Sequence, residues 1–276
     1  MDTADLIRAR FGQDNPASDT ATASETMRNI LRRRSHRQFK PEPLADDLLN
    51  NLLATALSAP SKSDLQQVAV IRVRDPDKQA RIARLSSDTA WLEQAPVFLV
   101  WCGDSRRIRR LAEWRGHAFA NDHLDAFMNA AVDAGICMQT FIIAAESIGL
   151  GCCPVSQIRD HIDALSAELE LPQYVFPVAG LCVGWPKLDP GISMRLPMSL
   201  TVHEDRYDDA DLMQEVVHYD QRREAAEPTA PDQQRLVERY GIASDYGWSE
   251  NRSRQYSVPA RADFGRYIRK QGFNLS

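Results

Sequence analysis

The sequence lacks the long apolar segments that would place a protein in a membrane or direct it to secretion. Within its 276 residues, no uninterrupted apolar run reaches the roughly 18 residues that cross a bilayer. The first 26 residues contain no apolar core of signal-peptide length. We therefore expect a cytoplasmic protein with no membrane partner.

An excess of basic charge is also missing. The formal net charge is −5, and the isoelectric point is near 5.7. Domains that bind nucleic acids often have isoelectric points above about 9. We therefore expect no nucleic-acid partner. A cationic cluster in this chain is local, which favours a pocket over an extended surface for DNA.

The five cysteines lack the spacing of a zinc site, and no CxxC pair occurs. Four of them lie in apolar runs, which predicts buried free thiols and no bound metal. A nucleophilic role for Cys152 or Cys153 stays open as an alternative. It would require an activating base, and the sequence does not place His161 near either thiol.

Glycine-rich nucleotide motifs are absent as well. No strand, glycine loop and helix form a GxGxxG fingerprint, and no Walker A lysine motif occurs. A nicotinamide cofactor, if one is used, must therefore bind by other means.

The apolar patterns that are present predict an α+β protein. Residues 44–57 and 122–150 have helical spacing, whereas residues 68–73, 95–102 and 175–186 are typical of strands. We interpret residues 1–25 as a flexible leader, because residues 13–25 are small and polar. Residues 26–276 form a single domain in this interpretation, with a helical C-terminal extension over about 208–276.

Five cations lie within residues 31–40, beside Ser35 and His36. Four of them are arginines, whose planar guanidinium groups can bind a phosphate through two hydrogen bonds. Charge alone leaves two interpretations open, a solvated basic turn and an anion site. The loop over residues 58–67 is also rich in hydrogen-bond donors.

Several ordered motifs together resemble the FMN-dependent nitroreductase family. The similarity is greatest to its branch of oxygen-insensitive NADPH nitroreductases and NADPH-flavin oxidoreductases. The motifs are RRSHRQF (33–39), SAPSKSDLQ (58–66), FIIAAESIGLG (141–151), LPQYVFPVAGLCVGWP (171–186), RLP (195–197), VHE (202–204) and YIRKQGF (267–273).

The resemblance implies a fold and an activity. The implied fold is a three-layer α+β sandwich, with a central mixed, mainly antiparallel sheet flanked by helices, in a swapped homodimer. The implied activity is ping-pong hydride transfer from NADPH or NADH, through FMN, to nitroaromatic, quinone or flavin acceptors. Two alternatives stay open: a specialised flavin reductase or dehalogenase-type metabolite reductase, and a non-catalytic FMN-binding protein. No catalytic side chain is implied, since FMN carries the redox chemistry.

The resemblance also implies which residues bind the cofactor. The phosphate and ribityl ligands would be Arg33, Arg34, Ser35 and Arg37, with Arg195 at the phosphate. The contacts to FMN, or to the partner subunit's flavin, would be Ser61, Lys62, Ser63 and Gln66. The contacts to the flavin ring would be Thr89, Pro154, Val155, Ser156 and Gln157. Arg261 would bind the acceptor or NADPH, and we expect Arg32, His36 and Lys40 to face solvent.

The sequence departs from the family pattern at two places. Ser156 and Gln157 stand where the family often has two glycines, so their side chains are expected to narrow the pocket or to add hydrogen bonds at its reactive edge. Ser193 stands where a second cation is expected, two residues before Arg195.

Overall fold

The computed structural model describes residues 1–12, 24–86 and 90–276, so the predicted ring contact Thr89 lies outside the described residues. The chain divides into two compact units. Unit 1 comprises Met1–Arg33 and Gly191–Ala260, and unit 2 comprises Arg34–Pro190 and Arg261–Ser276. This division differs from the single domain over 26–276 that the sequence suggests, because the N-terminal segment belongs with most of the C-terminal region.

Unit 2 contains a four-stranded antiparallel sheet with the strand order β1-β2-β4-β3. Its strands are β1 (Val68–Val73), β2 (Val97–Asp104), β3 (Gly151–Val155) and β4 (Val175–Gly184). The two central strands are buried on both faces, which explains their continuous apolar sequences. Strand β3 lies at an edge of the sheet. Proline has no amide hydrogen to donate, so Pro154 is tolerated there more readily than in a central strand.

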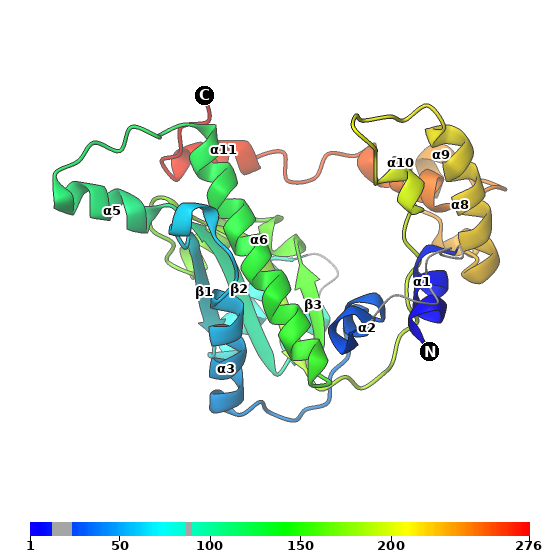
Figure 1. Cartoon of the computed structure of the whole chain (residues 1–276), viewed down its shortest axis with the longest axis horizontal. Helices are drawn as coiled ribbons and strands as arrows, with labels where there is room; N and C mark the ends of the chain where they lie inside the picture. Colours follow the sequence, from blue (N-terminus) through cyan, green and yellow to red (C-terminus); the bar gives the residue numbers. More distant parts are fainter. Residues whose placement is uncertain (13–23, 87–89) are drawn as a thin grey trace. The chain divides into compact units, whose positions relative to one another are not determined.

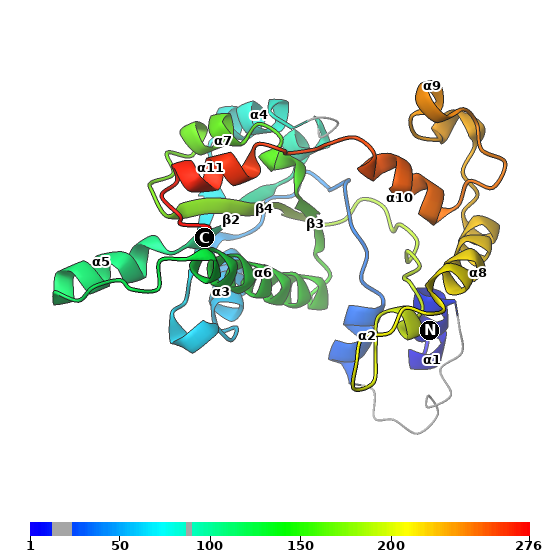
Figure 2. The ribbon, with the colours of Figure 1, turned by 90° about the horizontal axis from the view of Figure 1, so that it is seen from above.

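Helices cover both faces of this sheet (Figure 2). One face packs against α3 (Asp46–Leu57) and α6 (Leu124–Ser147), and the other against α4 (Pro76–Arg84), α7 (Ile162–Glu168) and α11 (Phe264–Lys270). Successive residues of β2 point to opposite faces, so Leu99 and Trp101 belong to the first core, and Phe98 and Val100 to the second. The predicted three-layer α+β sandwich is therefore confirmed.

Helix α6 is long and apolar enough to cross a membrane when judged by length and composition alone, a test that the core helices of soluble proteins also pass. Its inner face packs on the sheet, with Phe141 edge-on to Trp101 at 5.8 Å between ring centroids. Its outer face exposes a row of apolar side chains, defined by Leu124, Met128, Val132 and Ile136. We call this row the α6 stripe.

Unit 1 is helical in its described part, and its helices are α1 (Thr3–Phe11), α2 (Glu25–Leu31), α8 (Leu212–Ala226), α9 (Val237–Tyr240) and α10 (Trp248–Tyr256). Helix α1 lies inside the predicted flexible leader, so that prediction is wrong for residues 3–11. A capping box between Asp2 and Asp5 starts the helix, and Gly12 ends it in the left-handed conformation. Leu6 and Arg10 are buried, which fixes the helix to the unit.

The remaining elements are short. Unit 2 also holds α5 (Arg106–Arg115) and the 3-10 turns η1 (Lys62–Asp64), η2 (Ala90–Gln94) and η3 (Gln157–Arg159), while unit 1 holds η4 (Met198–Leu200) and η5 (Pro231–Gln233). Figure 1 labels the main elements along the chain.

Candidate functional site

The basic segment of unit 2, residues 34–37, lies beside the open edge of β3. Ser35 forms a parallel bridge with Cys152, and the His36 amide donates to the Cys152 carbonyl at 3.1 Å. Further along, the Lys40 amide donates to the Trp185 carbonyl at 2.8 Å. The segment is therefore extended and held by backbone hydrogen bonds, as a fixed binding element requires.

His36 does not face solvent, so that prediction is wrong. Its side chain is buried, with 9% exposed, because the bridge to β3 turns the ring against Gly151. A Cβ on Gly151 would lie 2.7 Å from the His36 Cγ, so the close approach depends on glycine. Arg32 and Lys40 are exposed, as expected.

The two arginines of this segment differ in their surroundings. Arg34 is half-buried, and its Nε lies 2.5 Å from a carboxylate oxygen of the exposed Asp189. Arg37 is exposed, and Ser35 between them is half-buried. The segment thus presents one restrained guanidinium, one hydroxyl and one solvated guanidinium, a donor set that suits a phosphate.

Residues 154–157 continue from the same edge strand. Pro154 and Ser156 are exposed, whereas Val155 is buried and fixes the segment to the core. Ser156 has a right-handed backbone conformation, with φ −80° and ψ −24°, so this position does not require the glycine that is common in the family.

Arg261 comes to this region from the C-terminal part of the chain. Its guanidinium forms an ion pair with Asp160 at 2.8 Å, three residues after Gln157. The neighbouring Arg159 donates to the Val178 carbonyl of β4, and burial followed by the nearby Arg261 lowers the pKa of Arg159. The structure therefore brings residues 34–37, residues 154–157 and Arg261 to one end of the unit 2 sheet.

The predicted donor loop, residues 61–66, is fastened to α6. The buried Asp133 carboxylate accepts the amides of Lys62 at 3.0 Å and Gln67 at 3.1 Å. Within the loop, the Ser61 hydroxyl accepts the Gln66 amide at 2.6 Å, and Ser63 and Gln66 have left-handed φ values of 51° and 52°. These contacts hold a strained loop in one conformation.

Sequence reasoning missed two residues that hold this loop. Asp133 is one of the few acids of the mainly apolar helix α6, and an acid in such a helix indicates a buried polar contact. Arg107 donates to the Gln66 carbonyl at 2.6 Å and pairs with Asp104, and nothing in the sequence distinguished it from the other arginines of α5. Both residues line a cavity of about 380 Å³ beside the loop, with Leu65 and Cys137.

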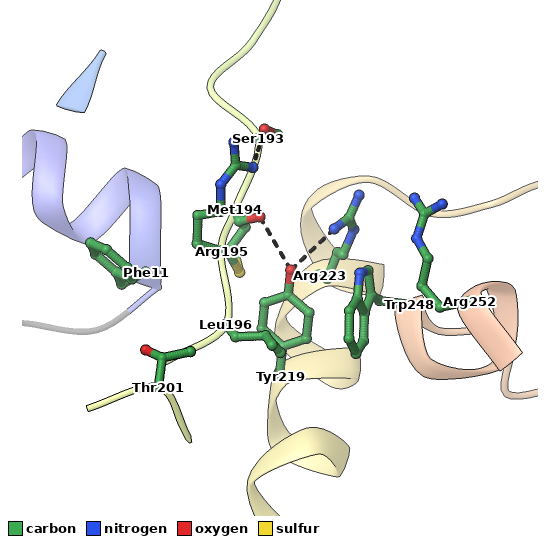
Figure 3. A pocket seen from close by; sticks show the side chains of 10 residues that line it. All are labelled: Phe11, Ser193, Met194, Arg195, Leu196, Thr201, Tyr219, Arg223, Trp248 and Arg252. Atoms are coloured by element: carbon green, nitrogen blue, oxygen red, sulfur yellow. Dashed lines mark hydrogen bonds between the residues drawn. The ribbon is translucent and has the colours of Figure 1, made fainter. Parts of the chain in front are cut away.

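The other predicted phosphate ligands, Arg33 and Arg195, belong to unit 1. Arg195 is exposed, and its guanidinium donates to the Ser193 hydroxyl at 2.9 Å. Arg195 lines a cavity of about 600 Å³ that also contains two arginines which the sequence did not indicate (Figure 3). The residues lining it are Phe11, Ser193, Met194, Arg195, Leu196, Thr201, Tyr219, Arg223, Trp248 and Arg252.

All five cysteines are free and buried, as predicted. Burial raises the pKa of the Cys102 thiol to about 12 and raises that of Cys182 as well. Cys152 and Cys153 lie inside the core, which argues against a nucleophilic role. Within residues 1–12, 24–86 and 90–276, no group of three His, Cys, Asp or Glu side chains could hold a metal ion.

Comparison with known proteins shows which family this chain belongs to. The family model described as "Nitroreductase family" matches residues 30–185, and that described as "Nitroreductase family, C-terminal domain" matches residues 193–276. The chain belongs to the nitroreductase family. The family that the motifs predict is thereby confirmed.

Individual members of the nitroreductase family are similar over most of the chain. An "FMN reductase [NAD(P)H]" of Bacillus subtilis is 32% identical over 91% of this chain and 99% of its own length. An "NADPH-flavin oxidoreductase" of Vibrio harveyi is 32% identical over 77% of this chain and 87% of its own length. The solved structure of B. megaterium NfrA2 aligns with a TM-score of 0.83 and 33% identity, and covers 92% of this chain and 100% of that one.

Proposed function

We propose that this chain is an FMN-dependent oxidoreductase that transfers hydride from NADPH or NADH to nitroaromatic, quinone or flavin acceptors. The observation that carries the proposal is the extended basic segment, residues 34–37, held against β3 beside residues 154–157 in a member of the nitroreductase family. Relatives named for FMN, NADPH and NAD(P)H support the cofactors. The net charge of −5 supports the absence of a nucleic-acid partner. A cytoplasmic location without a membrane partner stays part of the proposal.

The residues of unit 2 fit FMN by their chemistry. Arg34, Ser35 and Arg37 would bind the phosphate and ribityl chain, since guanidinium groups form strong charge-assisted hydrogen bonds with phosphate. Backbone hydrogen bonds to Cys152 and Trp185 already hold this segment, so binding would cost little ordering entropy. Arg33 and Arg195 are proposed as further phosphate ligands, and Ser61, Lys62, Ser63, Gln66 and Thr89 as contacts to FMN or to the partner subunit's flavin.

Bound FMN would supply the acceptance and donation of hydride. Residues 154–157 would line its ring. Pro154 has no amide hydrogen, so any backbone donor to the ring must come from Val155, Ser156 or Gln157. Arg261 would attract an anionic acceptor or the NADPH phosphates, although its ion pair with Asp160 offsets part of its charge. Hydride transfer itself needs no general acid, and we assign none.

We further propose a homodimer in which a second copy covers the α6 stripe. The exposed fractions of Leu124, Met128, Val132 and Ile136 are 49%, 59%, 47% and 36%. The four residues follow one another at four-residue spacing, so they share one face of the helix. A contiguous exposed apolar surface of this kind marks an interaction site. The swapped arrangement of the homodimer stays part of this proposal.

The oligomeric state tests the dimer. Sedimentation equilibrium should give twice the chain mass of 31.1 kDa for the wild type. Met128→Glu, which places a charge in the α6 stripe, should shift the population to monomer. Arg110→Glu, at an exposed position on α5 outside the stripe, is the matched control and should leave the dimer intact. A monomeric wild type would contradict the proposal.

The colour and reactivity of the purified protein test the function. Bound flavin should absorb at about 450 nm, and the flavin released on denaturation should be FMN. Anaerobic mixing with NADPH or NADH should bleach this band, and a screen of acceptors under both nucleotides would identify the substrate class. Colourless protein that does not take up FMN would exclude the proposal. Yellow protein that neither nucleotide bleaches would identify a flavin-binding protein without catalytic activity.

A further inference from the structure

Arg10 of α1 contacts both segments of unit 1 that carry predicted phosphate ligands. Its side chain is buried, with 5% exposed. The guanidinium donates to the Leu31 carbonyl at 2.7 Å and 3.1 Å, to the Ser193 carbonyl at 2.7 Å, and to the Arg33 carbonyl. One side chain thus joins the end of α2 to the loop that leads to Arg195.

A second set of contacts ties the same loop to α1. The Arg195 amide donates to the Arg10 carbonyl at 2.6 Å. The next residue, Phe11, lines the cavity that contains the Arg195 side chain (Figure 3). At Gly12, a Cβ would lie 3.2 Å from the Met194 sulfur, so the helix end also packs closely on the loop. The last residues of α1 and its C-cap Gly12 therefore lie against the loop around Arg195, and Arg10 holds its backbone.

Helix α1, which supplies one side of these contacts, lies outside the part of the chain that the family models match. The matches cover residues 30–185 and 193–276, whereas α1 spans Thr3–Phe11. Ser193, which stands where a cation is expected, takes part in these contacts: its carbonyl accepts from Arg10, and its hydroxyl accepts from Arg195. The loop that leads to Arg195 has one fewer cation than expected, but the buried Arg10 side chain holds it through hydrogen bonds.

We propose that Arg10 is a positioning residue for the FMN phosphate, which acts by holding Arg33 and Arg195 in place. The inference rests on the proposed function, which assigns the phosphate to these two residues. A guanidinium that bonds three carbonyls pre-organises the loop, so Arg195 does not have to be ordered when the ligand binds. Without Arg10, the three carbonyls lose a charged donor, and the loop gains alternative conformations.

Fluorescence titration of the apoprotein with FMN and with riboflavin tests this role, because riboflavin has the ring and ribityl chain but no phosphate. Arg10→Ala should weaken FMN binding by about tenfold, the effect of one charged hydrogen-bond network, and change riboflavin binding by less than about twofold. Arg8→Ala is the matched control on the same helix, because its side chain is 60% exposed, and it should change neither affinity. Combining Arg10→Ala with Arg195→Ala should weaken FMN binding by less than the product of the two single effects.

The outcomes separate this inference from the proposed function. If Arg195→Ala weakens FMN binding and Arg10→Ala does not, the role of Arg10 is overturned and the phosphate assignment stands. If Arg10→Ala weakens FMN and riboflavin equally, Arg10 is only structural, and the inference is overturned. If Arg195→Ala leaves the FMN affinity unchanged, the assignment of Arg195 to the phosphate is wrong, and the inference about Arg10 falls with it.

Hydrogen exchange on the wild type keeps the inference testable if Arg10→Ala does not fold. The Arg195 amide should exchange as slowly as the interior amides of α1 in the apoprotein, because it donates to the Arg10 carbonyl. Exchange of this amide at the rate of the exposed residues 204–209 would overturn the proposal.

Discussion

Unit 2 buries an apolar core on each face of its sheet, whereas the described part of unit 1 buries few apolar side chains and as many polar ones. The first core of unit 2 includes Trp101 and Phe141, and the second includes Phe98 and Phe176. In unit 1 the buried apolar residues are Leu6, Pro197, Tyr219 and Tyr246, and the buried polar residues are Arg10, Asn29, Gln234 and Arg254.

The buried polar groups of unit 1 bond to backbone. Arg254 donates to the carbonyls of Arg235 and Gly241, and the Gln234 side chain both donates to and accepts from Ala243. Hydrogen bonds are directional, and losing one partner leaves the other unsatisfied, whereas apolar contact is non-directional. The stability of unit 2 therefore depends on the volume that its apolar cores fill, and that of unit 1 depends on particular hydrogen-bond donors.

The largest effect is expected from an apolar truncation in unit 2. Phe141→Ala should lower the free energy of unfolding by about 4 kcal/mol, because the side chain is fully buried and its removal leaves a cavity beside Trp101. Denaturant unfolding followed by circular dichroism measures the change. A loss below about 1 kcal/mol would show that the apolar cores do not dominate the stability of unit 2.

The second-largest loss of stability is expected in unit 1. Arg254→Met keeps the buried volume but removes the donors to two carbonyls and the ion pair with Glu250 at 2.6 Å. We expect a local loss of about 3 kcal/mol, seen as faster hydrogen exchange over residues 234–256 with unchanged exchange in the sheet. Arg206→Met, at a side chain that is 83% exposed, is the control and should have no effect. Equal protection in both variants would remove the proposed contrast between the units.

A smaller effect is expected where the basic segment meets β3. Gly151→Ala should cost about 2 kcal/mol and weaken FMN binding, because the added methyl group pushes His36 and the residues beside it away from the strand. Gly265→Ala in α11 is the matched control, since its added methyl group meets only ordinary contact with Arg269. Unfolding midpoints and FMN titrations of both variants measure the difference. An unchanged FMN affinity in stable Gly151→Ala protein would argue against a role for this segment.

The smallest effect concerns the thiols, and it reports on unit 2 alone because all five cysteines lie there. Thiol reagents at pH 8 should react slowly with native protein and faster with Phe141→Ala, whereas Arg254→Met should match the wild type. Burial raises the pKa of Cys102 from 9.0 to about 12. The unfolded thiol therefore loses its proton first, so this contribution to stability is present below pH 9 and is lost as the pH rises toward about 12. Rapid labelling of native wild-type protein would contradict the burial.

The sequence predicted unit 2 better than unit 1 because apolar periodicity and ordered motifs report directly on a sheet and its covering helices. The burial of His36 was missed, since it depends on Gly151, a residue 115 positions away. Arg10 was missed for the same reason: it bonds Ser193, 183 residues further along, and it lies in a segment whose polar composition suggested a leader. Polar anchors between distant segments leave no periodic pattern in the sequence.

The central claim is that the basic segment of unit 2 binds the FMN phosphate, and FMN affinity in three arginine variants tests it most directly. Arg34→Ala and Arg37→Ala should each raise the FMN dissociation constant by about tenfold or more, the loss of one charge-assisted phosphate contact. Arg32→Ala should stay within about twofold of the wild type, because Arg32 is exposed and pairs with Glu25 at 2.6 Å. Equal affinity in all three variants would contradict the account.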